Sequence, residues 1–301
     1  MAYKPRTEPL MLKILHYLDG RMVLSENEKQ YYLTLKKGYE GEVKFDLLTK
    51  KISSECLVLN DLLLEVNNTL FQIDTTLIFQ DTIYLLDVKN HEGDYIFESG
   101  EFFTMSRKDI KNPLQQLKRS TSLFRLLLHN LGYHFNIESN VIFINPAFTL
   151  YQNPLNEPII FPTQLDRFKK KLDMIPSKLN SRHKKLADQL ISLHITKSPY
   201  THSPKYNYGI LRKGLSCCAC DSLSFSASEK KCVCADCGHE EAIDTAVIRG
   251  VSELKVLFPE MKITTNLVHE WCNGEVSIKS IRRILKQNLT TKGNTRFCYY
   301  E

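Results

Sequence analysis

The spacing of apolar residues after Lys37 predicts a helix followed by three strands. Apolar residues recur at helical spacing at Val43, Leu47, Leu48 and Ile52. Three runs of β-type composition follow this helix, namely Leu57–Leu64, Thr69–Phe79 and Thr82–Lys89.

The next part of the chain adds a second helix and a further strand. Short strands broken by glycines are expected between residues 93 and 104. Asn112-Pro113 opens a helix that runs to about Asn130, because a proline in the first helical turn loses no hydrogen bond. Asn140–Asn145 is interpreted as a buried strand. The order helix, three strands, helix, strand is typical of an α/β unit built on a mixed sheet.

Other segments flank this unit on both sides. Residues 1–36 contain a Leu/Tyr-rich amphipathic stretch, interpreted as a helical packing extension. Eight Lys and Arg residues stand against two Asp residues between positions 166 and 185, a run that is usually a solvated helix face. Residues 173–214 are interpreted as a basic linker. Residues 245–301 return to helical periodicity, with a β-like end at Arg296–Tyr300.

The composition excludes a wholly disordered chain. Of its 301 residues, 43% are hydrophobic and 25% are charged, which is ordinary for globular proteins. No apolar run approaches the roughly 20 residues that cross a bilayer, and a signal-peptide pattern is missing, so we expect a cytoplasmic protein without a membrane partner. The net charge of +6 is compatible with a nucleic-acid partner. The sequence is equally compatible with a monomer and a homo-oligomer.

Two aspartates and a lysine fall on the second and third predicted strands. If these strands form a hairpin that turns at Gln80-Asp81, Asp74 lies directly opposite Asp87, with Cβ atoms about 4.5–5.5 Å apart. Lys89 then shares their face of the sheet, because strand side chains alternate. An odd loop length would break this pairing, since Gln-Asp is not a favoured two-residue turn.

Two opposed carboxylates repel each other, so a purely structural hairpin would avoid them. A divalent cation removes the repulsion, and Mg²⁺ prefers hard oxygen ligands while keeping several of its waters. Lys89 would then orient an attacking water and stabilise charge developing on a phosphate. The alternative is that both aspartates sit at strand ends, with Lys89 in solvent.

Four short motifs in this part of the chain follow one another in a distinctive order. They are Gly-Tyr-Glu-Gly-Glu at 38–42, Gln-Ile-Asp at 72–74, Asp-Val-Lys-Asn at 87–90 and Asn-Pro-Leu-Gln-Gln at 112–116. In this order they resemble the nuclease-related domain called NERD, of the PD-(D/E)xK nuclease superfamily, over residues 37–172. The resemblance implies a restriction-endonuclease-like αβββαβ core and nuclease chemistry.

The resemblance also implies roles for five residues. Asp74 and Asp87 would be ligands of Mg²⁺ or Mn²⁺, and Lys89 would be the catalytic lysine. Glu42, at the start of the first helix, would assist the metal or its water. Gln116 would contribute from the later helix.

Alternatives remain for some of these residues. Gln115 is the less favoured neighbour of Gln116, which can also be an ordinary exposed helix residue. Glu42 can be a carboxylate favoured by the helix dipole at a helix start. The sequence departs from the superfamily pattern in having Ile73 where a proline is usual and Asp87 where a glutamate is commoner.

The cysteines cluster in a way that predicts a metal site rather than a disulfide framework. Six of the nine lie between positions 217 and 237. Two Cys-x-x-Cys pairs are separated by thirteen residues and formed by Cys217, Cys220, Cys234 and Cys237. Four thiolates complete a closed tetrahedral shell, which predicts a zinc ribbon over residues 215–241 with one structural Zn²⁺. Gly238 permits a tight turn after the second pair, while Cys218, Cys232 and His239 are competing ligands.

The C-terminal segment predicts two short helices, Thr264–Cys272 and Ser277–Leu289, with Thr264 and Ser277 as N-caps. The second helix carries a basic stripe at helical spacing, made of Lys279, Arg282, Arg283 and Lys286. Residues 288–300 would form a two-stranded wing that turns at 292–294. A basic second helix followed by a wing is a common DNA-reading arrangement, so residues 245–301 are interpreted as winged-helix-like. The alternative is a solvated helix in a small packing domain, and Trp271 is expected in its core.

The sequence as a whole predicts a metal-dependent nuclease that hydrolyses phosphodiester bonds in DNA. The zinc ribbon and the basic helix would hold the nucleic acid. The competing hypothesis is a catalytically inactive DNA-binding regulator or adaptor. An RNA-directed enzyme is a third possibility, because a basic stripe does not discriminate RNA from DNA.

Overall fold

The computed structural model of the chain describes residues 2–153, 155–196, 204–227, 231–293 and 298–301. Its elements divide into two units. The first unit comprises Met1–Glu8 and Thr34–Thr201, and the second comprises Pro9–Leu33 and His202–Glu301. The extension expected over residues 1–36 is therefore shared between the two units.

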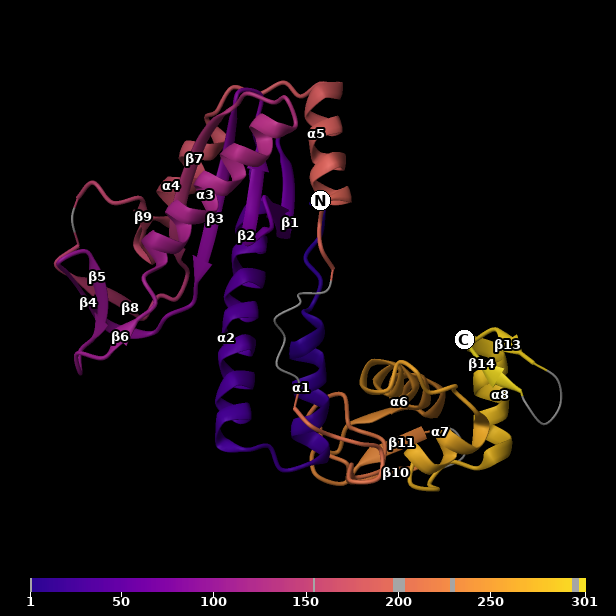
Figure 1. The fold of residues 1–301 in the computed structure, drawn as a ribbon. Coiled ribbons are helices and arrows are strands. Elements are labelled where there is room, and N and C mark those ends of the chain that lie inside the picture. The colour runs from indigo at the N-terminus through magenta and orange to yellow at the C-terminus, as the bar shows by residue number, and fades with distance from the viewer. Residues whose placement is uncertain (1, 154, 197–203, 228–230, 294–297) are drawn as a thin grey trace. The chain divides into compact units, whose positions relative to one another are not determined.

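A five-stranded mixed sheet forms the centre of the first unit (Figure 1). Its strands, in spatial order, are β1 (Leu57–Val66), β2 (Thr69–Ile78), β3 (Thr82–Lys89), β7 (Asn136–Phe143) and β9 (Ile159–Ile160). The first three strands are antiparallel, whereas β3, β7 and β9 run parallel. The mixed α/β sheet is confirmed, although its fourth predicted strand begins four residues earlier than expected, at Asn136.

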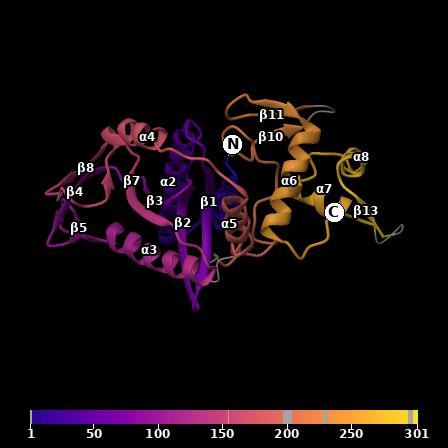
Figure 2. The ribbon, with the colours of Figure 1, turned by 90° about the horizontal axis from the view of Figure 1, so that it is seen from above.

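Helices cover both faces of this sheet, as Figure 2 shows. One face packs against α2 (Glu26–Thr49) and α4 (Leu165–Asp173), through Phe45 and Phe168 among others. The opposite face packs against α3 (Pro113–Asn130) and α5 (Ser181–Ser192). The segment 173–214 is therefore not only a linker, because Leu186 and Leu190 of α5 are fully buried against β1 and β2.

A second, four-stranded sheet extends the first unit beside β7. Its order is β6 (Asp109–Ile110), β5 (Glu101–Thr104), β4 (Gly93–Glu98) and β8 (Phe148–Tyr151). The strands expected between residues 93 and 104 are thus present. This sheet packs through Phe97, Phe102 and Phe148 against Phe143 of β7 and Leu117 of α3. A short 3₁₀ helix, η1 (Pro162–Gln164), precedes α4.

The helix expected to start near Gly38 begins twelve residues earlier, at Glu26. Neither Gly38 nor Gly41 interrupts it. A Cβ atom at position 41 would lie 2.5 Å from Cβ of Asn90 and 3.2 Å from Cγ2 of Ile144. Gly41 therefore lets α2 approach the end of β3 closely, which no larger residue would allow. Glu42 consequently lies in the helix interior, so a helix-start dipole does not account for it.

The second unit combines α1 (Leu10–Arg21) with the C-terminal elements. A three-stranded antiparallel sheet is made of β10 (Phe225–Ala227), β11 (Lys231–Cys234) and β12 (Glu240–Ala242), and three helices follow it, α6 (Ile243–Leu257), α7 (Thr265–Trp271) and α8 (Ile278–Asn288). Arg21 joins α1 to this unit through a buried ion pair with Glu253, at 2.5 and 2.7 Å, and its guanidinium lies 4.0 Å from the centre of the Trp271 ring. Trp271 is fully buried, as expected.

The C-terminal helices agree with their predicted caps. The hydroxyl of Thr264 accepts a hydrogen bond from the Leu267 N–H, and that of Ser277 accepts one from the Ser280 N–H. Strands β13 (Thr291–Lys292) and β14 (Tyr299–Tyr300) pair antiparallel. The expected wing turn extends to Asn294 and the expected β-like end starts at Arg296, and both of these residues lie outside the described ones.

None of the helices in the described part of the chain combines the length and the apolar character that a bilayer crossing needs.

The packing of Gly41 predicts opposite effects for two glycine substitutions in the same helix. Gly41→Ala should destabilise the protein by about 1–3 kcal/mol, because the new methyl group overlaps Asn90. Gly38→Ala should stabilise it by about 0.5–1 kcal/mol, since nothing lies within 4 Å of its Cβ position. Urea unfolding followed by circular dichroism measures both. Both variants gain the same helix propensity, so equal stabilities would contradict the close approach of α2 to β3.

Candidate active site and cysteine centre

Five predicted residues come together from four elements of the first unit. Glu42 lies on α2, Asp74 on β2, Asp87 and Lys89 on β3, and Gln116 on α3. We refer to these five residues as the acidic site.

The β2–β3 hairpin has the register that the sequence predicts. Ile78 pairs with Ile83 and Thr75 with Leu86, and the same register brings Asp74 opposite Asp87. The ladder of main-chain pairs ends at this point. Instead, the Val88 N–H donates a hydrogen bond of 2.7 Å to Oδ2 of Asp74. The Asp74 side chain thus takes the place of a main-chain acceptor where the two strands separate.

Asp87 has a different partner on each of its oxygens. Nε2 of Gln116 donates a 3.2 Å hydrogen bond to Oδ1. Nζ of Lys89 forms an ion pair with Oδ2 at 2.7 Å. The neighbouring Gln115 instead bonds to Glu101, which makes Gln116 the glutamine that contacts the acidic site.

Arg6 completes the arrangement, although it was not identified from the sequence. Its nearly buried guanidinium lies 2.6 Å from Oε2 of Glu42 and 3.0 Å from Oδ2 of Asp46. It also donates a 2.8 Å hydrogen bond to the main-chain oxygen of Asp74. The one available signal was that Glu42 and Asp46 are one helical turn apart, so that two like charges share a face and need a cation.

Burial raises the pKa values of all three carboxyl groups in the acidic site, and the charge of Asp74 adds to this at the other two. Burial raises the pKa of Asp74. Burial and the charge of Asp74 raise the pKa of Asp87 to about 6. The same two causes raise the pKa of Glu42 to about 8, although Arg6 opposes them. Burial alone would lower the pKa of Lys89, but the carboxylates of Asp87 and Asp74 outweigh it and hold that pKa above its ordinary value.

These residues fit a divalent cation. In the ion-paired set, the cations of Arg6 and Lys89 stand against four carboxylates, namely Glu42, Asp46, Asp74 and Asp87. The carboxyl groups therefore outnumber the ion-paired cations, and burial and the charge of Asp74 raise the pKa values of Glu42 and Asp87. Among the described residues, no three potential ligand groups of this site lie within 4.8 Å of one another. A divalent cation bound here would therefore be held by one or two carboxylates and would keep several of its waters.

The cysteine centre is formed by the four predicted thiols, whose sulfur atoms all lie within 4.8 Å of one another. Sγ of Cys217 lies 3.7 Å from Sγ of Cys237, and Sγ of Cys220 lies 3.6 Å from Sγ of Cys234. Gly238 has the positive φ of +71° that a tight turn after the second pair requires. This centre on the β10–β12 sheet has the ligands of a zinc ribbon and can hold a structural metal such as zinc.

The competing ligands lie apart from the four thiols. Cys218 and His239 form a second group, with Sγ 3.1 Å from Nε2, and Glu241 completes it. Both oxygens of Glu241, however, accept hydrogen bonds from Arg249. Cys232 is buried outside both groups.

The four residues of the predicted basic stripe are all exposed on α8. Arg283 nevertheless forms a two-pronged ion pair with Asp244 of α6, at 2.7 and 2.9 Å. Among the described residues, Lys279, Arg282 and Lys286 have no such acidic partner. Three of the four stripe residues therefore keep their charge available, and the fourth stabilises the contact between α6 and α8.

The model of the family described as NERD, nuclease-related domain, matches residues 37–144. No curated protein and no solved structure matches the chain. The matched segment contains all five residues of the acidic site, whereas Arg6 and the cysteine centre lie outside it.

The geometry of the cysteine centre predicts how metal content responds to substitution. The purified protein should hold one tightly bound zinc ion per chain, and Cys217→Ser/Cys234→Ser should lose it, because two ligands cannot complete a tetrahedral shell. Cys218→Ser is the matched control and should keep the metal, since this exposed thiol lies outside the group of four. Inductively coupled plasma mass spectrometry measures the zinc content. Zinc that persists in the double variant would contradict the ligand assignment.

The raised pKa of Glu42 predicts that the metal-free protein loses stability as the pH rises. Its folded pKa of about 8 exceeds the unfolded value of about 4.3, so the folded state binds the proton more tightly than the unfolded state does. The stability contributed by this group is therefore present below about pH 4 and is lost as the pH rises through 8. Glu42→Gln removes that loss, so its stability relative to wild type should increase between pH 5 and pH 8.5.

Urea unfolding in EDTA at several pH values measures this trend. The substitution also alters the contact with Arg6, which shifts the whole curve, so only its change with pH is diagnostic. Glu40→Gln, an exposed glutamate on the same helix, is the control and should run parallel to wild type. If the stability of Glu42→Gln also changes with pH in parallel with wild type, the pKa of Glu42 is not raised.

Proposed function

Because residues 37–144 carry a nuclease-related domain, we propose that the chain is a metal-dependent nuclease that hydrolyses phosphodiester bonds in DNA at the acidic site. The observation that carries the proposal is the pair of buried aspartates on β2 and β3, with the Lys89 ammonium ion-paired to Asp87. A structural hairpin gains nothing from opposed buried carboxylates, whereas a hydrolytic site needs them.

Asp74 and Asp87 are the residues that would hold Mg²⁺ or Mn²⁺. When bound, such an ion polarises a phosphate oxygen and lowers the pKa of a bound water. The hydrogen bond from Gln116 to Oδ1 of Asp87 fixes the carboxylate plane. The Val88 N–H fixes the plane of the Asp74 carboxylate in the same way, by donating a hydrogen bond to Oδ2 of Asp74. Both carboxylates are therefore oriented before any ligand arrives.

Lys89 and Glu42 would act on the reacting groups. The Lys89 ammonium is held beside Asp87, where it would stabilise negative charge that develops on the phosphate and would orient the attacking water. The pKa of Glu42, about 8, is close to neutral pH, which suits a group that accepts a proton from water. Arg6 is a positioning residue, because it touches Glu42 and the Asp74 main chain rather than the reacting atoms.

The second unit would bind the nucleic acid. Lys279, Arg282 and Lys286 offer exposed positive charge on α8, which follows α7 in a helix–turn–helix-like pair and precedes the β13–β14 hairpin. Contacts with phosphates release counterions and would make binding fall steeply with salt. The cysteine centre would act as a structural staple, because four thiolates leave no open position for chemistry.

The proposal predicts cleavage that depends on metal and on the two strand residues. Wild type should cut linear, nicked or single-stranded DNA with Mg²⁺ or Mn²⁺ and should be inactive in EDTA. Asp87→Asn and Lys89→Met should each lower the cleavage rate by about 100-fold or more, since each removes a charge next to the reacting phosphate. Gel-resolved time courses measure the rates after circular dichroism has shown that every variant is folded.

Asp94→Asn is the matched control, because it neutralises an exposed carboxylate on β4 and should keep full activity. Folded wild type that binds DNA without cutting it would favour the inactive regulator instead. Cleavage of RNA but not of DNA would identify RNA as the substrate. Activity that survives both strand substitutions would place the chemistry outside the acidic site.

A further inference from the structure

A cavity of the first unit lies at the end of the sheet away from the acidic site. It has a volume of about 850 Å³ and is lined by the β2–β3 turn, the end of α3, the start of β7 and the start of α5. The seven residue steps from Thr82 to Lys89 separate the two ends of β3 by about 23 Å. This space, which we call the basic cavity, is therefore distinct from the acidic site.

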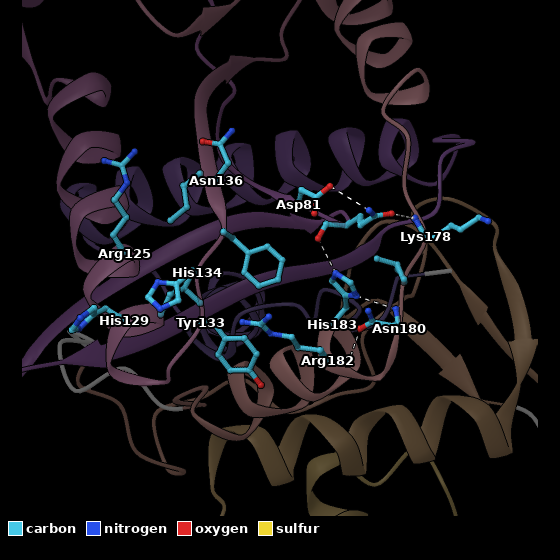
Figure 3. Close-up of a pocket in the computed structure, with 15 residues that line it drawn as sticks. Asp81, Arg125, His129, Tyr133, His134, Asn136, Lys178, Asn180, Arg182 and His183 are labelled. Atoms are coloured by element: carbon cyan, nitrogen blue, oxygen red, sulfur yellow. Dashed lines mark hydrogen bonds between the residues drawn. The ribbon is translucent and has the colours of Figure 1, made fainter.

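Cationic side chains outnumber acidic ones in the walls of the basic cavity. Three permanent cations line it together with two exposed histidines, namely Arg125, Lys178, Arg182, His129 and His134. Among the lining residues Asp81 is the single acidic one. Figure 3 shows Arg125, His129 and His134 on one side of the space and Lys178 on the other. Such a surplus of positive charge in a concave site favours an anionic ligand.

Aromatic rings line the same cavity. Tyr133 and Phe135 are half-buried, with nearly parallel rings whose centres are 6.5 Å apart. The guanidinium of Arg182 lies 5.6 Å from the centre of the Tyr133 ring, so cation and ring present one continuous surface. Aromatic rings next to arginines are the means by which proteins bind the base and the phosphate of an unpaired nucleotide.

Hydrogen bonds connect the residues at the base of the cavity. His183 is buried, and its Nδ1 accepts a hydrogen bond from the Asn180 N–H, so Nε2 carries the proton and donates to the Gln80 main-chain oxygen at 2.9 Å. The side-chain oxygen of Gln80 accepts a 3.0 Å hydrogen bond from the Lys178 N–H (Figure 3). The β2–β3 turn is thereby joined to the start of α5, and the cavity is preformed rather than created by a ligand.

We propose that the basic cavity binds a nucleotide, with its phosphate between Arg125 and Arg182 and its base against Tyr133. A cavity of about 850 Å³ is far larger than a phosphate ion needs and falls within the range of small-molecule sites. The nucleotide is either free or an unpaired residue of a nucleic-acid strand, since both present the same phosphate and base. The proposal goes beyond hydrolysis at the acidic site and does not depend on it.

Isothermal titration calorimetry of the full chain in EDTA tests this site without any cleavage. The probes are thymidine 5′-monophosphate, thymidine, inorganic phosphate and a 5′-phosphorylated hexathymidylate. The monophosphate should bind more tightly than either thymidine or phosphate alone, because it engages both the cations and the ring. A hexamer that binds much more tightly than the monophosphate identifies a strand as the source, and equal affinities identify a free nucleotide.

Matched variants locate the binding. Arg125→Ala/Arg182→Ala should weaken monophosphate binding about tenfold or more, because two charged contacts to the phosphate are lost. Lys184→Ala/Lys185→Ala removes the same charge from exposed positions of α5 outside the cavity and should leave the affinity unchanged. Tyr133→Leu should weaken the monophosphate about fivefold or more and inorganic phosphate hardly at all.

Two results would overturn the proposal. One is the absence of monophosphate binding by folded wild type, and the other is equal weakening by the cavity variant and the control variant. Neither result bears on cleavage at the acidic site, which is measured separately with metal. Conversely, an inactive acidic site leaves binding in EDTA intact.

Discussion

The first unit is organised around the burial of like charges. Asp74 and Asp87 lie side by side between a sheet and its helices, where an uncompensated carboxylate costs several kcal/mol. Arg6 provides part of the compensation from far along the chain. The N-terminal segment that carries Arg6 runs along β1. The Tyr3 N–H donates a hydrogen bond to the Val58 main-chain oxygen, and the main chain of Lys4 pairs with that of Leu59 in parallel fashion. The N-terminal residues are thus held against the sheet so that one guanidinium reaches Glu42, Asp46 and the Asp74 main chain at once.

The compensation of the buried negative charge is incomplete, because among the described residues only two ion-paired cations, Arg6 and Lys89, face four carboxyl groups. Burial and the charge of Asp74 keep the pKa values of Glu42 and Asp87 high. A divalent ion bound to this cluster would gain both charge and ligands.

The parts of this site that the sequence predicted are those set by local periodicity. The hairpin register follows from strand alternation about Gln80-Asp81, and the helix with Gln116 follows from its Asn-Pro start. Arg6 was missed because no periodicity links it to Glu42, 36 positions away. The role of Gly41 was missed because its close approach to Asn90 arises only in packing. Likewise, the buried Leu186 and Leu190 of α5 follow a run of charged residues, so that segment was interpreted as a linker.

The two ends of the β2–β3 hairpin carry opposite charge, and this bears on how the proposed sites would work together. Phosphates share the charge of the acidic site, so in the metal-free protein they are repelled from Asp74 and Asp87 and attracted to the basic cavity. Binding at the cavity is then independent of metal, whereas approach of a phosphate to Lys89 requires the residual negative charge to be neutralised first. The hairpin would therefore hold nucleic acid at one end while the ion bound at the other end decides whether a phosphodiester can reach the reacting groups.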